Sequence, residues 1–115
     1  MTTTIYGIKN CDTIKKSLKW LDANNIAYTF HDYRVNGLDV ELLDQLCQLS
    51  DPQLMLNKRS TSFRALTDEQ KNNLDDASLK ALFLATPTLI KRPLLIKETK
   101  VLLGFKDAQY QEFFA

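Results

Sequence analysis

The chain has 115 residues, of which 44% are hydrophobic, with 15 Lys and Arg against 14 Asp and Glu. This length fits one domain whose hydrophobic core needs no disulfide or metal to stabilise it. Because the positive and negative charges are almost equal in number, the composition argues against a nucleic-acid binder that works through bulk charge. No apolar run reaches the roughly 20 residues of a membrane helix, and the first residues lack the pattern of a signal peptide, so we expect a cytoplasmic protein with no membrane partner.

The first third of the sequence has the pattern of a β-α-β unit. Residues 3–8 read as a short strand, and apolar residues recur with a helical period from Asp12 to residues 24–25. Residues 26–33 alternate like a second strand, and a turn follows at 36–37. Such a unit requires two parallel strands joined by a right-handed crossover.

The middle of the sequence predicts several short helices. Asp39 is the expected N-cap of a helix that closes near Pro52, and a helical turn over residues 54–56 follows it. Residues 57–64 are polar and basic, and we expect a loop there.

The next helices are predicted from their capping residues. Thr67 and Gln70 have the spacing of a capping box. Ser78 is the expected cap of a further helix, which Pro87 stops.

The end of the sequence predicts a hairpin and a final helix. Residues 94–96 and 100–103 have strand patterns with a turn near 98–99, and Asp107 opens the helix. The complete order predicts an α/β fold: a thioredoxin-like core with a mixed four-stranded sheet and an inserted helical subdomain.

We expect a single domain. The thioredoxin-like core would be formed by about residues 1–36 and 88–115, and the helical insert by about residues 38–87. The helices of the insert are too short to form an independent core.

Cys11 lies where the first predicted strand passes into the first helix. The first turn of a helix has unpaired N–H groups and about half a positive charge, which together stabilise a thiolate, the reactive form of cysteine. Lys9, Lys15 and Lys16 add positive potential. We therefore predict that Cys11 is the reacting group; the alternative is a small helix-start residue that happens to be cysteine.

The second cysteine, Cys47, lies among leucines on an apolar helix face. A buried free cysteine behaves as a small hydrophobic residue, so we favour a structural role, with a resolving thiol as the alternative. His31 is the only histidine, and no cluster has the spacing of a zinc site. We expect no metal.

Arg92 precedes Pro93 at the start of a predicted strand. Proline restricts the preceding residue to extended backbone, so Arg92 can offer its planar guanidinium to an oxyanion or a carboxylate; the alternative is a solvated charge. Arg59 lies in the segment 57–64, which we interpret as an ordinary polar surface loop, with an anion-binding loop as the alternative.

In combination these motifs resemble the arsenate reductase (ArsC)/Spx superfamily, and most closely its small YffB-like branch. The resemblance extends in order over essentially the whole chain. It is carried by residues 6–16, 30–33, 56–64, 90–95 and 103–105.

The resemblance implies a thioredoxin-like fold with an inserted helical subdomain and a catalytic cysteine, which maps onto Cys11. It maps the conserved arginine before proline, a stabiliser of the anion or the thiolate, onto Arg92. Family members commonly use glutathione, often with glutaredoxin. The expected substrate-binding residues are Lys9, Asn10, Asp12, Thr13, Arg59 and Pro93.

Two departures bear on the function. Spx-type regulators carry Cys-x-x-Cys, but no second thiol follows Cys11 at that spacing. Arsenate reductases that use glutathione carry three arginines, and only Arg92 carries over cleanly. The middle arginine aligns with Asn57, near Arg59, and the last aligns near residues 105–106.

We therefore expect a monomeric cytoplasmic oxidoreductase, a glutathione-dependent thiol reductase with a single catalytic cysteine. It would bind no cofactor, use glutathione as co-substrate and act on a small molecule or a mixed disulfide, with glutaredoxin as a further candidate partner. The alternatives are a genuine arsenate reductase and a non-enzymatic, Spx-like regulator that binds RNA polymerase.

Overall fold

The computed structural model describes residues 3–9 and 11–115. The chain divides into two compact units, one formed by Met1–Gly37 with Arg92–Ala115 and the other by Leu38–Lys91. The single-domain organisation expected from the sequence stays a prediction.

The first unit contains a four-stranded sheet in the order β2-β1-β3-β4. β1 pairs in parallel with β2, whereas β3 is antiparallel to both β1 and β4. This mixed sheet confirms the predicted fold class. The strands are β1 (Thr3–Gly7), β2 (Thr29–Asp32), β3 (Leu94–Lys97) and β4 (Lys100–Leu103).

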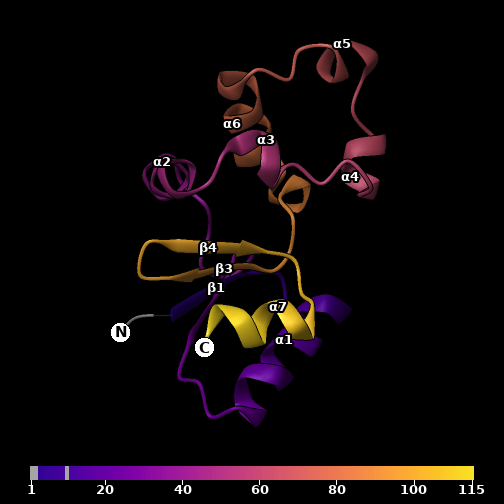
Figure 1. The fold of residues 1–115 in the computed structure, drawn as a ribbon. Helices are drawn as coiled ribbons and strands as arrows, with labels where there is room; N and C mark the ends of the chain where they lie inside the picture. Colours follow the sequence, from indigo (N-terminus) through magenta and orange to yellow (C-terminus); the bar gives the residue numbers. More distant parts are fainter. Residues whose placement is uncertain (1–2, 10) are drawn as a thin grey trace. The chain divides into compact units, whose positions relative to one another are not determined.

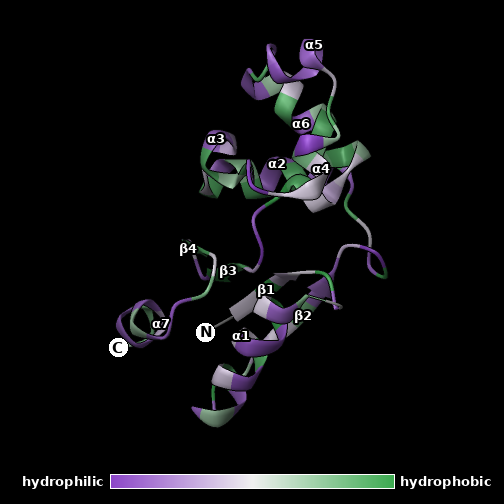
Figure 2. Cartoon of the chain, turned by 90° about the vertical axis from the view of Figure 1, so that its right-hand side faces the viewer, coloured by the Kyte–Doolittle hydropathy of each residue, from purple (hydrophilic) through white to green (hydrophobic). Residues whose placement is uncertain are grey.

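Two helices, α1 (Asp12–Ala23) and α7 (Asp107–Phe113), lie on the same side of this sheet (Figure 1). Figure 2 colours both partly hydrophilic and partly hydrophobic, as expected for helices with one apolar face. That face contributes to a core whose fully buried members are Ile5, Leu21, Leu95 and Tyr110.

A buried hydrogen bond joins the two helices within the core. The hydroxyls of Ser17 and Tyr110 are 2.6 Å apart, and both residues are fully buried. Each of the two buried hydroxyls therefore has a hydrogen-bond partner, as buried polar groups generally do.

The second unit is helical. Its core includes Leu43 and Leu46 from α2, Met55 from α3, and Leu79 and Phe83 from α6. The elements are α2 (Val40–Leu49), α3 (Pro52–Met55), α4 (Thr61–Arg64), α5 (Asp68–Lys71), α6 (Asp76–Ala85) and the 3-10 helix η1 (Pro87–Leu89).

Two helix starts follow the predicted capping chemistry. The Asp39 carboxylate accepts from the Leu42 N–H at 2.8 Å. Thr67 and Gln70 form the predicted capping box, with distances of 2.9 and 3.1 Å.

Two predictions in this unit are wrong. The segment 57–64 is not a loop throughout, because Ser60 caps the short helix α4 by accepting from the Phe63 N–H. Ser78 does not cap α6; Asp75, three residues earlier, accepts from the Ser78 N–H at 2.8 Å, and the helix begins at Asp76.

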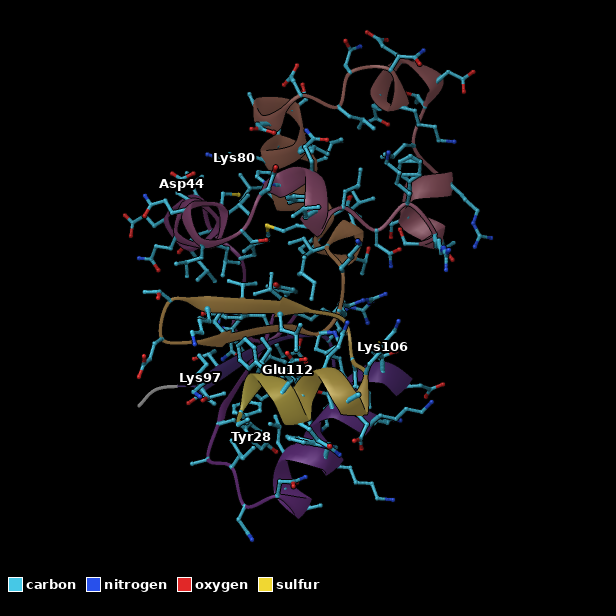
Figure 3. All side chains as sticks on the ribbon, viewed as in Figure 1. Tyr28, Asp44, Lys80, Lys97, Lys106 and Glu112 are labelled. Atoms are coloured by element: carbon cyan, nitrogen blue, oxygen red, sulfur yellow. The ribbon has the colours of Figure 1, made fainter. Side chains whose placement is uncertain are left out.

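A salt bridge joins α2 and α6, where Lys80 Nζ lies 3.3 Å from Asp44 Oδ1 (Figure 3). Both side chains are about half exposed, so the pair contributes at most about 1 kcal/mol. Across the described residues, no helix is long and apolar enough to cross a bilayer.

Candidate functional site

Cys11 is the N-cap residue of α1, as predicted from the sequence. Its backbone is extended, with φ −124° and ψ 126°, and its carbonyl accepts from the Lys15 N–H at 3.0 Å. The half-buried thiol makes no capping hydrogen bond within the described residues. The sulfur is therefore left beside the unpaired N–H groups of the first helical turn.

The loop that carries Cys11 is anchored by Asp32, the last residue of β2. The Asp32 side chain is 7% exposed. One carboxylate oxygen accepts from the Lys9 N–H at 3.1 Å, and the other accepts from the Arg34 N–H at 2.8 Å. The end of β2 thus positions the chain two residues before Cys11.

Sequence reasoning missed this role of Asp32. The residue is paired with Gly7 only because β1 and β2 run in parallel. The available signal was an acidic residue at the end of the strand that was predicted to pair with the strand before Cys11.

Gly7 allows α1 to approach the end of β1 closely. A Cβ at this position would clash with the side chain of Ile14, which is fully buried. A larger residue at position 7 would therefore force the Ile14 side chain to shift.

Arg92 and Pro93 enter the sheet at the end where β1 leaves it. Leu94 pairs with Tyr6 in the antiparallel ladder, so the two residues before it reach the β1–α1 junction. Their peptide bond is cis, and the Pro93 carbonyl accepts from the Gly104 N–H at 2.9 Å. Pro93 is buried and Arg92 is half-buried.

Tyr33, directly after β2, lies at the same end of the sheet. Its N–H donates to the Gly7 carbonyl at 2.9 Å, and its ring centroid is 6.3 Å from that of Tyr6. Tyr33 is 4% exposed, and its buried hydroxyl has no hydrogen-bond partner among residues 3–9 and 11–115. Burial raises the pKa of Tyr33, the Tyr6 hydroxyl raises it further, and the Arg92 charge opposes both.

The contacts of His31 indicate a structural role. Its Nε2 lies 2.7 Å from the Gly37 carbonyl oxygen, and the centroid of its ring is 5.1 Å from that of the Tyr6 ring.

The remaining predicted residues fall into two groups. Lys9, Asp12 and Thr13 flank Cys11 in the loop and the first turn of α1, whereas Asn10 lies outside the described residues. Arg59 belongs to the other unit.

Arg59 is exposed and lines a pocket of about 410 Å³. Its N–H donates to the Asn57 side chain at 3.1 Å, and its carbonyl accepts from Arg64 at 3.0 Å. The other lining residues are Gln53, Leu56, Asn57, Lys58 and Lys91. The assignment of Arg59 to the substrate site stays a prediction.

Cys47 also belongs to the second unit. Burial raises the pKa of its thiol, and nearby carboxylates, Asp44 first among them, add to the rise against the opposing charge of Lys80. A raised pKa keeps the thiol neutral and unreactive, which supports a structural role.

The family of the chain follows from comparison with known proteins. The ArsC family profile matches residues 6–113. An uncharacterised protein of Haemophilus influenzae is 47% identical over 97% of this chain and 98% of its own length. The solved structure of a YFFB protein has a TM-score of 0.91 and 45% identity, covering 99% of this chain and 100% of that one.

A further structure, of an arsenate reductase (ArsC) related protein from Brucella melitensis, has a TM-score of 0.82 and 47% identity, covering 99% of this chain and 95% of that one. A Spx regulator of Lactiplantibacillus plantarum is 25% identical over 95% of this chain and 83% of its own length. A glutaredoxin from Archaeoglobus fulgidus, with a TM-score of 0.53 and 14% identity over 97% of this chain and 84% of that one, shares the fold alone. The resemblance seen in the sequence is confirmed: the chain belongs to the ArsC family.

Proposed function

We propose that this protein is a cytoplasmic, glutathione-dependent thiol reductase in which Cys11 is the single catalytic cysteine. The observation that carries the proposal is the position of Cys11 at the N-cap of α1, with its thiol not engaged in capping. Its loop is anchored by Asp32, and β3 brings Arg92 to the same end of the sheet.

The proposed reaction is thiol–disulfide exchange in two steps. The Cys11 thiolate attacks the glutathione sulfur of a mixed disulfide, so that a Cys11–glutathione disulfide forms and the substrate leaves as a thiolate that takes a proton from water. A second glutathione thiolate then attacks this disulfide, which releases oxidised glutathione and restores the Cys11 thiolate. Glutaredoxin could replace glutathione in the second step.

One of the other proposed binding residues, Arg92, acts on the anionic part of the substrate. Arg92 binds a carboxylate or an oxyanion through its planar guanidinium. The remaining proposed substrate-binding residues are those that the family resemblance implies: Lys9, Asn10, Asp12, Thr13, Arg59 and Pro93.

A second candidate function is arsenate reduction, which the similarity to the arsenate reductase related protein of Brucella melitensis favours. Cys11 would form a covalent bond to arsenic with loss of water. A glutathione thiolate would then attack the Cys11 sulfur, which breaks the sulfur–arsenic bond, forms a Cys11–glutathione disulfide and releases arsenite; a second glutathione or glutaredoxin would reduce this disulfide. A third candidate, favoured by the distant similarity to Spx, is a non-enzymatic regulator that binds RNA polymerase.

A pair of cysteine variants tests the leading proposal. With glutathione and a glutathione mixed disulfide as substrates, we expect Cys11→Ser to lose turnover at least about a hundredfold, because serine supplies no thiolate. Cys47→Ser is the matched control and should retain turnover. Unchanged turnover in Cys11→Ser would end the proposal.

The alternative functions have their own readouts. Arsenate-dependent oxidation of glutathione by the wild-type protein, measured with and without glutaredoxin, tests the second candidate. Recovery of RNA polymerase by both wild type and Cys11→Ser would favour the third.

A further inference from the structure

Two hydrogen-bond donors lie at the catalytic end of the sheet without an acceptor. The Tyr33 hydroxyl is buried and unpartnered within the described part of the chain. No carboxylate of the described residues lies within 4.0 Å of the Arg92 guanidinium, since Lys80–Asp44 is the one salt bridge found among them.

The unpaired Tyr33 hydroxyl needs an explanation, because it is buried. A buried hydroxyl without a partner costs roughly 1–3 kcal/mol, and native proteins contain few of them. A guanidinium carries donors and no acceptor, so Arg92 cannot receive the Tyr33 proton. A ligand with a negatively charged oxygen would satisfy both groups.

The fold brings these two residues to the same end of the sheet, on the two sides of β1. The Tyr33 N–H binds the carbonyl of Gly7, the last residue of β1, and the pairing of Leu94 with Tyr6 brings Arg92 to the same strand end. The Arg92 charge lowers the pKa of Tyr33, but less than burial and the Tyr6 hydroxyl raise it.

The surroundings favour an anion. The Tyr33 ring packs against Tyr6 and His31, with centroid distances of 6.3 and 6.0 Å. The Tyr33 hydroxyl itself is buried, and a hydrogen bond to a charged acceptor is stronger where water is excluded. Arg92 is half-exposed, so an anion in solution can reach its guanidinium.

We propose that the Tyr33 hydroxyl is a substrate-binding group that donates, together with Arg92, to a negatively charged oxygen of the substrate. The inference rests on the proposed function and deepens it, because it adds a residue that neither the sequence motifs nor the family comparison assigned. The shared ligand chemistry is an anionic oxygen, either a carboxylate of glutathione or an oxygen of a tetrahedral oxyanion.

The test removes the hydroxyl alone, with Tyr33→Phe. We expect the dissociation constant of the anion to rise about tenfold or more, as for the loss of one hydrogen bond to a charged acceptor. Binding is measured by NMR chemical-shift titration of the Cys11→Ser protein with glutathione and, separately, with arsenate. Weaker binding of glutathione or of arsenate supports the proposal and identifies the source of the oxygen; unchanged binding of both overturns it.

Controls separate binding from folding. Tyr28→Phe removes a tyrosine hydroxyl that lies beside Asp22, near the C-terminal end of α1, and should leave both dissociation constants unchanged. The melting temperature of Tyr33→Phe should equal or exceed that of the wild type, since an unpaired buried hydroxyl is lost. The double variant Tyr33→Phe/Arg92→Gln should bind the anion more tightly than the sum of the two single losses in binding free energy predicts, because both groups contact one anion. If the two losses in binding free energy are additive, the shared ligand is contradicted.

The same experiment distinguishes the two proposals. If the wild type fails to turn over the mixed disulfide but Tyr33→Phe still weakens anion binding, the proposed function fails and the anion site stands. If the wild type is active and Tyr33→Phe binds both anions normally, only the present inference fails.

Discussion

At the scale of single residues, the carboxylate of Asp32 determines how the loop before Cys11 is held. Both of its oxygens accept from backbone N–H groups, those of Lys9 and Arg34. A buried acceptor that serves two donors cannot be replaced by any residue with a single acceptor oxygen.

The isosteric variant Asp32→Asn is therefore expected to be destabilising. Its amide nitrogen would face one of the two N–H donors, so one part-buried hydrogen bond is lost, at a cost of about 1 kcal/mol. We expect a lower free energy of unfolding in urea and faster alkylation of Cys11, because the loop is less firmly held and the thiol becomes more accessible. Glu112→Gln, an equal charge change on the exposed side of α7, is the control; equal effects of the two changes would contradict the role of Asp32.

At the scale of elements, helix starts are determined by the best local acceptor. Asp75 and Ser78 can both cap a helix, but the Asp75 carboxylate accepts from the Ser78 N–H and so begins α6 at Asp76. The hydrogen bonds donated by Ser78 lower the pKa of Asp75 below its ordinary value.

We expect Asp75→Ala to lower the urea midpoint of unfolding by more than Ser78→Ala does, because alanine at 78 retains the donating N–H. Since the folded-state pKa of Asp75 is depressed, the cap contributes above the ordinary aspartate pKa and is lost as pH falls through the folded value. The difference between wild type and Asp75→Ala should therefore shrink in acid. A larger effect of Ser78→Ala would restore Ser78 as the cap.

At the scale of the whole molecule, buried tyrosines link stability to alkaline pH. Burial raises the pKa of Tyr110 from 10.0 to about 12, against the opposing hydrogen bond from Ser17. Burial also raises the pKa of Tyr33. The unfolded chain loses these protons first, so it binds fewer protons than the native state between pH 10 and about 12.

The free energy of unfolding is therefore expected to fall as pH rises above about 10, by roughly 1.4 kcal/mol per pH unit for each such tyrosine. Tyr110→Phe should be less stable at neutral pH, because Ser17 loses its partner, and should show a shallower alkaline decline. Urea unfolding between pH 8 and pH 11 measures both effects; equal slopes in the two proteins would contradict the role of Tyr110.

The sequence by itself determined the order of the elements and the place of Cys11, because helical period, strand alternation and capping residues act over a few neighbouring positions. Local chemistry also identified the capping box at Thr67 and the hairpin before Asp107. The sequence-based prediction was wrong for α4, which was expected to be a loop, and for the cap of α6, where both Asp75 and Ser78 are suitable capping residues.

The groups that meet at the end of the sheet could be identified only once the strands were paired. The bond from Lys9 to Asp32 joins residues 23 positions apart, and the approach of Arg92 depends on the register of β3 against β1. The unpaired state of the Tyr33 hydroxyl depends on every residue that surrounds it. Strand pairing and burial are collective properties of the folded chain, so no local pattern in the sequence contains them.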